Sequence, residues 1–217
     1  MGAAVAIREA AVPSPAGDLA DLRFRALLPA KDWAALPLAV RRRFSKRLTG
    51  GTTVTYCGGV VAVRASAAGR LLAHAARLIG GPLPLVFEPG ASVVTVTEDH
   101  VGQGQVWTRV YARRTGFPQV VHSAKRFAGP TGLEEYVGAG ISMALTVAVE
   151  DEALVFRSAF YFATVLGLRI RLPRGAEPGR LTIVHRDLGD GAFAFTLALD
   201  HPWLGRLLSQ DAVFKDA

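Results

Sequence analysis

The chain has 217 residues, of which 50% are hydrophobic and 20% are charged. This composition excludes general disorder, and the length suits one domain with a substantial core. The single cysteine, Cys57, excludes an internal disulfide and a cysteine-built zinc site. We therefore expect one domain over residues 1–217, with a flexible arm at residues 1–17, in the cytoplasm.

The net charge of +7 and the pI of about 10.2 raise nucleic-acid binding as an alternative. The basic residues cluster once, at residues 41–43, Lys46 and Arg47, and are otherwise scattered. We interpret this cluster as a solvated helix face rather than a site for anions or a partner, and we do not expect nucleic acid to bind. The longest uncharged apolar run, about residues 137–149, is too short to span a bilayer, so we expect no membrane partner.

The first part of the chain predicts two helices and one strand. Leu36, Val40 and Phe44 have the spacing of one buried helical stripe. Residues 52–65 are rich in β-branched side chains and predict a strand, in which two adjacent glycines indicate a bulge or a close backbone approach. A second helix is predicted at about residues 70–79, before a Gly-Gly-Pro stop.

From residue 84 onward the apolar pattern has a period of two, with turn signals between the segments. The predicted strands are residues 92–98, 105–114, 119–127, 137–149, 153–162, 168–172, 181–187 and 192–200. Short connections favour an antiparallel meander, and closure into a barrel removes its edges. We predict an α+β, mainly β fold: about eight or nine strands closing into a barrel-like, calycin- or lipocalin-like sheet, with two N-terminal helices. Residues 201–214 are expected to form a turn and a short helix.

The strand at residues 105–114 has the most informative face, because Trp107, Arg109 and Tyr111 lie on one side of it. This face can be an outer surface, where arginine stems lie over aromatic rings. It can also line a cavity, where a buried arginine needs a carboxylate or an anionic ligand. The periodicity leaves both interpretations open.

The candidate catalytic residues are those able to polarise a carbonyl or move a proton. Glu135 follows Glu134 at a strand start, where it is either a surface carboxylate or an inward partner of Arg109 that orients a substrate carbonyl or enol. Tyr161 offers a hydrogen-bond donor among phenylalanines. His201 is a titratable candidate, with a turn-capping role as the alternative. The candidate substrate-binding residues are Trp107, Tyr111, Ser123, Met143, Phe160 and Arg169.

Other chemistries lack their motifs. The five histidines show neither H-E-x-x-H nor paired spacing, and His185 with Asp187 is more typical of a solvated strand end, so we expect no metal. The sequence has no G-x-S-x-G for a serine nucleophile. It also lacks the G-x-G-x-x-G of dinucleotide-binding domains, and we expect no cofactor.

One ordered set of spaced residues runs through the chain: Trp107-x-Arg109-x-Tyr111, Ser123, Glu135-x-x-Gly138, Tyr161, Gly167, Leu172-Pro173 and His201-Pro202-x-x-Gly205. This set resembles a bacterial domain-of-unknown-function family, number four-one-six-six, over about residues 33–214. Members often lie C-terminal to saccharopine-dehydrogenase-like or epimerase-like Rossmann domains. The resemblance implies a shared pocket-like site. No redox role is implied here, because the dinucleotide fingerprint is absent, and the end SQDAVF replaces a glycine-containing segment.

We expect a cofactor-free enzyme of cyclase or isomerase type that binds a hydrophobic, polyketide-like molecule inside the barrel. The alternatives are a non-catalytic carrier or sensor, and an interaction module for a separate Rossmann-type enzyme. A homodimer is left open. An enzyme is expected to show Arg109 or Glu135 facing a closed cavity, a carrier an entirely apolar lining, and an interaction module a filled barrel with an exposed apolar patch.

Overall fold

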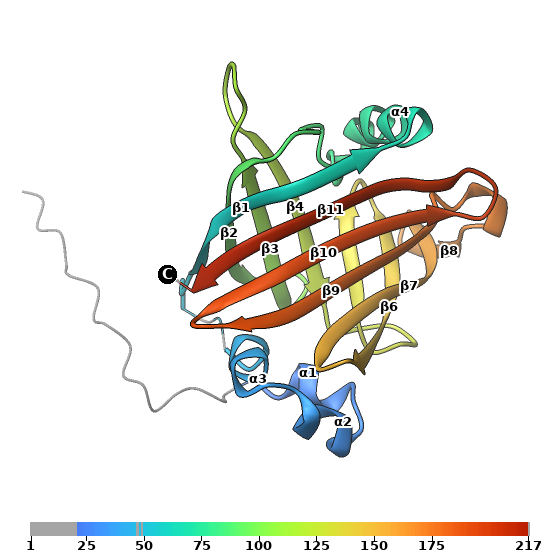
Figure 1. Ribbon diagram of the computed structural model, residues 1–217. Helices are drawn as coiled ribbons and strands as arrows, with labels where there is room; N and C mark the ends of the chain where they lie inside the picture. The colour runs from blue at the N-terminus through green and yellow to red at the C-terminus, as the bar shows by residue number, and fades with distance from the viewer. Residues whose placement is uncertain (1–20, 47, 49, 217) are drawn as a thin grey trace, which may run out of the picture.

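The computed structural model describes residues 21–46, 48 and 50–216, and its main feature is a closed β-barrel (Figure 1). The predicted arm at residues 1–17 lies outside the described residues. The strands of the barrel wall are β1 (Val54–Ala65), β2 (Gly90–Asp99), β3 (Gly104–Tyr111), β4 (Gln119–Arg126), β5 (Glu134–Gly138), β6 (Ile141–Glu150), β7 (Ala153–Val165), β9 (Arg180–Gly189), β10 (Ala192–His201) and β11 (Gly205–Asp216).

All strand pairings in the described residues are antiparallel, and neighbours in the wall are largely neighbours in sequence. β6 pairs with β7, β7 with β9, and β11 closes the ring against β1. The short strand β8 (Leu168–Arg171) forms a hairpin with the end of β7 and is not part of the closed ring. A closed ring leaves no long unpaired strand edge, which is the reason to expect closure in a meander of this length.

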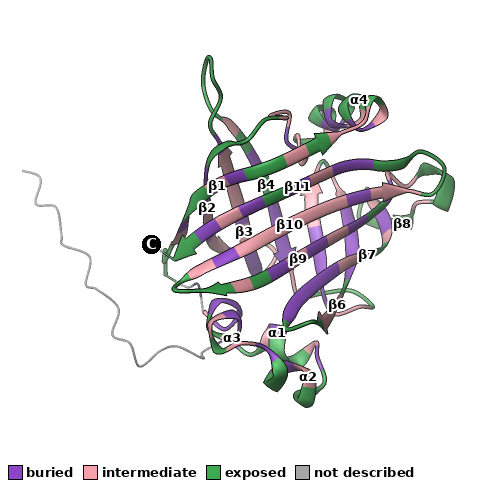
Figure 2. Cartoon of the chain, in the orientation of Figure 1, coloured by how far each residue is buried: buried purple, intermediate pink, exposed green. Residues whose placement is uncertain are grey.

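Helices lie at both ends of the barrel (Figure 1). α1 (Arg23–Ala26), α2 (Ala30–Ala35) and α3 (Leu38–Phe44) cover one end, while α4 (Ala67–Ala75) and the 3-10 helix η2 (Ala76–Ile79) lie at the other. A second 3-10 helix, η3 (Arg174–Ala176), connects β8 to β9. The N-terminal helices close their end, because the rings of Phe24 and Phe44 pack against Phe156 inside the wall. Along the strands of the wall, buried residues alternate with less buried ones, and the turns at the strand tips are largely exposed (Figure 2).

The predicted class is confirmed: a mainly β chain with an antiparallel barrel and few helices, some of them N-terminal. The stripe of Leu36, Val40 and Phe44 is buried as predicted. The helix that carries it is interrupted, because Pro37 precedes the first turn of α3 and separates it from α2. Near the middle of the chain, the single strand predicted at residues 137–149 is two strands, since Ala139 and Gly140 have positive φ and turn the chain.

The predicted C-terminal helix is wrong, because this segment is β11. Leu208, Ala212 and Phe214 alternate towards the barrel interior, and both edges of the strand are paired, with β1 and with β10. The pairing with β1 joins residues about 150 positions apart, which local propensity does not report. A Cβ on Gly58 would collide with the Val213 carbonyl oxygen, so of the two alternatives predicted for the glycine pair the close backbone approach occurs there, while the register of β1 shifts further on, between Val60 and Ala62.

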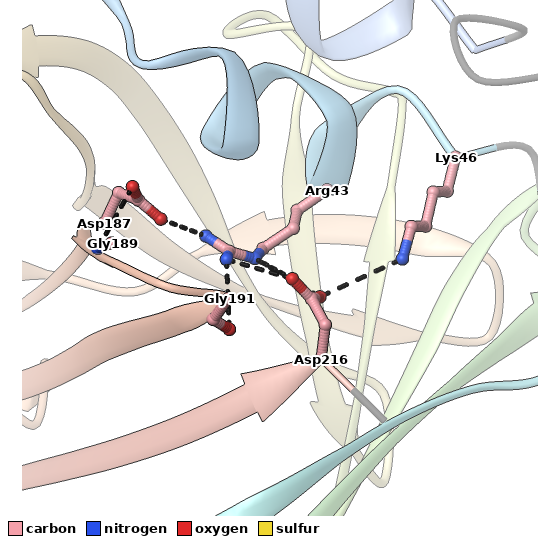
Figure 3. Close-up of polar contacts among 6 residues, drawn as sticks. All are labelled: Arg43, Lys46, Asp187, Gly189, Gly191 and Asp216. Atoms are coloured by element: carbon pink, nitrogen blue, oxygen red, sulfur yellow. Dashed lines mark hydrogen bonds and ion pairs between the residues drawn. The ribbon is translucent and has the colours of Figure 1, made fainter.

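Arg43 ties α3 to the barrel wall (Figure 3). Its guanidinium donates hydrogen bonds to Asp187 Oδ1 at 2.9 Å and to Asp216 Oδ2 at 3.0 Å. Burial alone lowers the pKa of Arg43, but these bonds outweigh burial, and the pKa is raised. The predicted solvated face is therefore wrong for Arg43, while Arg42 is exposed and Arg47 lies outside the described residues.

Candidate functional site

A cavity of about 340 Å³ occupies the half of the barrel nearest α4. This volume falls in the range of small-molecule pockets, roughly 300–1,000 Å³. Most of the lining is apolar, from inward side chains of the wall and from the segments that roof this end. These residues include Val121, Val137, Ile141, Met143, Leu181, Ile183, Leu197 and Leu199 of the wall, and Leu72, Ala75, Ile79, Leu83, Leu172 and Pro178 of the roof.

Close backbone packing holds α4 over the cavity. Ser66 caps the helix, its Oγ accepting a hydrogen bond from Gly69 N at 3.1 Å. Gly69 lies so close to β11 that a Cβ there would collide with the Leu207 carbonyl oxygen. At the other end of this segment, Gly80 takes a φ of 111°, which ends η2 and lets the chain turn back over the barrel. The roof is thus built by the sequence features that predicted a second helix and its stop.

The polar part of the cavity comes from three adjacent strands. Arg109 on β3 donates from Nη2 to Ser123 Oγ on β4 at 3.2 Å. The same Nη2 lies 3.6 Å from Glu135 Oε1 on β5. Lys125 Nζ on β4 donates to Glu135 Oε2 at 3.0 Å. Arg109, Ser123 and Glu135 line the cavity, while Lys125 lies behind them with its ammonium 5.1 Å from the centre of the Trp107 ring.

Glu135 stays ionised in this buried setting. Burial raises its pKa, but the positive charges of Lys125 and Arg109 and a hydrogen bond with Ser123 outweigh burial and lower the pKa to about 2. For Lys125, burial and the neighbouring Arg109 lower the pKa in spite of the attraction of Glu135. The cluster therefore holds two basic groups and one carboxylate. Both contacts of Arg109 within the described residues, the hydrogen bond to Ser123 and the ion pair with Glu135, use Nη2, which leaves the N–H groups of Nε and Nη1 to donate to a ligand oxygen.

Tyr161 is a hydrogen-bond donor rather than a base. Burial is the main cause that raises the pKa of Tyr161 to about 12, with Glu177 and Glu135 adding to the effect and a hydrogen bond with Ser158 opposing it. The phenol is therefore protonated at neutral pH. It lines the same cavity as Arg109 and Glu135. Together Arg109 and Tyr161 give a largely apolar space two donors suited to a carbonyl or carboxylate oxygen.

The structure brings six of the sequence-predicted residues to this cavity: Arg109, Tyr111, Ser123, Glu135, Met143 and Tyr161. Trp107 also faces inward, but it lines a smaller void of about 30 Å³. Arg109 and Tyr111 border both spaces, and Gln210 Nε2 donates to Tyr111 Oη at 3.5 Å in this region. The face of β3 that carries Trp107, Arg109 and Tyr111 therefore points into the barrel, which is the second of the two interpretations.

The other three predicted residues lie outside the cavity. His201, at the end of β10, accepts a hydrogen bond at Nδ1 from Trp203 N at 3.3 Å, which is the turn-capping alternative. Phe160 lies on the outer wall under the Arg171 guanidinium, and Arg169 covers Phe162 and pairs with Glu134.

A bulge in β7 decides which of its aromatic residues face inward. Ser158 pairs with Leu145 and Phe160 with Ala144, so Ala159 is an extra residue without a partner on β6. Unbroken alternation from Phe156 would carry Phe160 inside; the extra residue sends Phe160 outside and brings Tyr161 inside.

Sequence reasoning missed Lys125, although its alternation with Val121 and Ser123 places it on the inward face of β4. The interpretation of His185 as a solvated strand end is wrong. His185 is buried between the rings of Phe44 and Phe193, and burial, together with the charge of Arg43, lowers its pKa to about 3. It faces the plugged half of the barrel and does not line the cavity.

Within residues 21–46, 48 and 50–216, no group of three or more His, Cys, Asp or Glu side chains is placed to hold a metal ion. In the same described ranges, no helix has the length and apolar character needed to cross a membrane.

Comparison with known proteins gives a family. The model of a family described as Domain of unknown function (DUF4166) matches residues 36–214. No curated protein matches the sequence. The matched residues include almost the whole barrel, the roof of the cavity and the Arg109–Glu135 cluster. The chain therefore belongs to the DUF4166 family.

Proposed function

We propose that this protein binds a small hydrophobic molecule in the barrel cavity and acts on it as a cofactor-free enzyme of cyclase or isomerase type. The observation that carries the proposal is the pairing of Arg109 and Glu135 at the wall of a largely apolar cavity. A buried ion pair of this kind costs desolvation energy and contributes little to stability compared with apolar packing. Its presence at the lining of a cavity is better explained by a ligand than by the fold.

The charges of the cluster favour a ligand with a carbonyl or carboxylate oxygen. Glu135 is held by Lys125 and Arg109, so the anionic partner is already shared between two basic groups. Arg109 lines the cavity, and its contacts within the described residues use Nη2 alone. An oxygen that carries or develops negative charge there gains a charge-assisted hydrogen bond in a low-dielectric setting. The rest of the ligand is apolar, of polyketide-like size.

The protonation states favour cyclisation over isomerisation. Arg109 and Tyr161 polarise a carbonyl by donating to its oxygen, as an oxyanion hole does. An isomerase also needs a base that exchanges a proton near neutral pH. The pKa of Glu135 is about 2 and that of Tyr161 about 12, so neither group suits that role. Cyclisation of a chain with carbonyl groups in 1,3-relation starts from the enol that such a chain already forms in solution: the enol carbon bonds to a second carbonyl carbon, the enol O–H releases its proton as it becomes a ketone, and the new alkoxide takes up a proton. The cavity would contribute folding by shape and one polarised carbonyl to this step.

A non-catalytic carrier is the second candidate. It is favoured by the same absence of a near-neutral base among Arg109, Glu135 and Tyr161, since binding needs only the apolar space and one polar anchor. We place either activity in the cytoplasm, in keeping with a single cysteine, Cys57, that makes no disulfide.

The test is ligand capture followed by turnover. Native mass spectrometry of the protein from its own host, before and after denaturing extraction, detects a bound molecule. The affinities of three matched ten-carbon compounds, a ketone, a carboxylic acid and an alkane, are then measured. The differences between them give the contribution of the ligand oxygen to binding. We expect Arg109→Gln to weaken the ketone and the acid by about 10- to 100-fold and the alkane little. Arg64→Gln on the exposed outside of β1 is the matched control.

Each result has a definite meaning. The proposal is contradicted if the ketone, the acid and the alkane bind the wild type with equal affinity and Arg109→Gln changes none of these affinities. Oxygen-dependent binding with conversion of the captured molecule supports the enzyme, and oxygen-dependent binding without conversion supports the carrier.

A further inference from the structure

The cavity end of the barrel carries large apolar side chains that point into solvent. We call this set the mouth face. Leu166 at the tip between β7 and β8 is 99% exposed, Leu78 of η2 is 88% exposed, and Trp203 in the turn between β10 and β11 is 74% exposed. Leu71, Leu168 and Leu204 are exposed beside them. Figure 1 shows α4, β8 and the β10–β11 turn at the same end of the barrel, away from α1–α3.

The mouth face is continuous with the roof of the cavity. Leu78 immediately precedes Ile79, which lines the cavity. Leu168 lies on β8, which leads to the lining residue Leu172. A Cβ on Gly175, one residue before the lining residue Ala176, would lie in ordinary contact with the Trp203 ring. Three segments next to the roof of the cavity, namely η2, β8 and the β10–β11 turn, therefore carry exposed apolar side chains.

Leu166 holds an unfavourable backbone position at the outermost tip. Its φ is 49°, a region that leucine rarely adopts and that glycine, asparagine or aspartate fills in tight hairpin turns. Among the described non-glycine residues with positive φ, Leu166 is the one large apolar residue. Packing inside the protein does not explain it, because the side chain is almost fully exposed. A strained, solvent-facing leucine is a reason to look for an external contact.

The charge at this end is strongly positive. The connections at residues 66–89, 112–118 and 166–179 contain seven arginines and two glutamates. Four of these arginines, Arg77, Arg113, Arg114 and Arg174, are exposed and have neither an ion pair nor a contact over an aromatic ring within the described part of the chain. At the opposite end the turns between strands carry Asp151, Glu152 and Asp190 and no lysine or arginine, although helices α1–α3 beside them carry six basic residues and one aspartate. The positive charge is therefore shared by both ends, and the exposed apolar side chains are what distinguish the mouth face.

We propose that the mouth face docks on the surface of an anionic lipid bilayer, so that the cavity receives its ligand from the membrane. Leucine and tryptophan tips enter the boundary between headgroups and acyl chains, and the surrounding arginines contact lipid phosphates. Isolated apolar side chains separated by arginines can each insert into a fluid lipid surface. A surface that binds another protein has instead a contiguous, well-packed apolar centre. The expectation of no membrane partner came from the lack of a spanning segment, and a surface contact needs none.

Membrane docking is a property separate from the proposed function. Only the reason given for docking, supply of the ligand to the cavity, rests on the proposed function. A ligand supplied in solution can bind the cavity without a membrane, and the mouth face can bind vesicles with the cavity empty. The two proposals therefore fail separately.

The experiment is co-sedimentation of the full chain with vesicles of phosphatidylcholine alone or mixed with phosphatidylglycerol, at low and at moderate salt. The apolar test is Leu78→Glu with Leu166→Glu, and the charge test is Arg77→Gln with Arg174→Gln. The matched control is Val101→Glu with Leu188→Glu, two exposed apolar residues at the opposite end. None of these side chains lines the cavity.

We expect binding to the phosphatidylglycerol vesicles that weakens with salt, falls about fivefold for each arginine removed and falls more than tenfold in the double leucine variant. The control variant is expected to bind as the wild type does. The proposal is overturned by absence of binding, by equal binding of the mouth-face and control variants, or by self-association that the leucine variant abolishes in size-exclusion chromatography. That last result assigns the mouth face to a homodimer; capture of a Rossmann-type protein without vesicle binding would assign it to an interaction module.

Discussion

Lys125 and Glu135 face each other across β4 and β5, with Nζ 3.0 Å from Oε2, and both side chains are buried inside the barrel. Their pairing fixes the carboxylate that also lies 3.6 Å from Arg109 Nη2. Because Lys125 does not line the cavity, its part is to hold Glu135 ionised and in place, and Glu135 in turn positions Arg109 at the ligand space.

Removal of the Glu135 charge is expected to destabilise the fold strongly. Glu135→Gln leaves two buried basic groups without an anion, which predicts a loss of about 3–5 kcal/mol in the free energy of unfolding. Lys125→Met is expected to cost less, because Glu135 keeps Arg109 and Ser123 as partners. Urea unfolding measures both. Glu150→Gln, in the surface pair with Arg157, is the control and should leave the midpoint unchanged. A Glu135→Gln midpoint equal to the control contradicts the role given to this cluster.

His185 predicts a loss of stability in mild acid. Burial, with the charge of Arg43, holds its pKa at about 3 in the folded chain, below the ordinary value of 6.5. As the pH falls below 6.5, the unfolded chain takes up a proton that the folded chain does not, so stability falls by up to about 1.4 kcal/mol per pH unit down to about pH 3. The carboxylate of Glu135 adds to the loss only below its unfolded pKa, about 4.3.

The measurement is the free energy of unfolding between pH 7 and pH 5, above the range in which Glu135 contributes. His185→Phe, which keeps a ring between Phe44 and Phe193, is expected to flatten the slope. The exposed His100→Gln should leave the slope as in the wild type. An unchanged slope in His185→Phe would show that another group causes the acid sensitivity.

The period-two pattern was sufficient to predict the barrel and the inward strand face with Arg109. It failed where pairing rather than local sequence decides the structure. β11 looks like a turn and a helix in isolation, and its two neighbours make it a strand. The extra residue Ala159 reverses the alternation of β7, so Phe160 and Tyr161 could not both be assigned correctly without the register.

Charged residues were the other weak point. Lys125 and Arg43 were overlooked or placed in solvent because isolated basic residues are seldom buried. Each is buried with acidic partners from strands that are distant in sequence or lie beyond a turn: Glu135 for Lys125, and Asp187 with Asp216 for Arg43. The sequence contains these carboxylates but does not show which arginine or lysine they meet.

Arg43 is expected to stabilise the plug formed by α3. Arg43→Gln removes the charged hydrogen bonds to Asp187 and Asp216, for an expected loss of about 2 kcal/mol in the free energy of unfolding. Arg42→Gln, on the exposed side of the same helix, is the control. Hydrogen exchange gives a second readout: the amides of α3 should exchange faster in the Arg43 variant, while those of β6 and β7 should lose less protection. Equal stability of the two variants would place the closure of this end in apolar packing alone.

Gly69 tests how α4 roofs the cavity. In an exposed helix, replacement of glycine by alanine stabilises by about 0.5–1 kcal/mol. At Gly69 the new Cβ would collide with the Leu207 carbonyl oxygen, so the helix must move away from β11. We expect Gly69→Ala to destabilise the protein by about 1–3 kcal/mol and to speed release of a cavity-bound ligand. Gly90→Ala, where the nearest atom is 3.9 Å from the new Cβ, is the control for both measurements. A stabilised Gly69→Ala variant would mean that α4 is not seated on β11, and the roof of the cavity would then need another explanation.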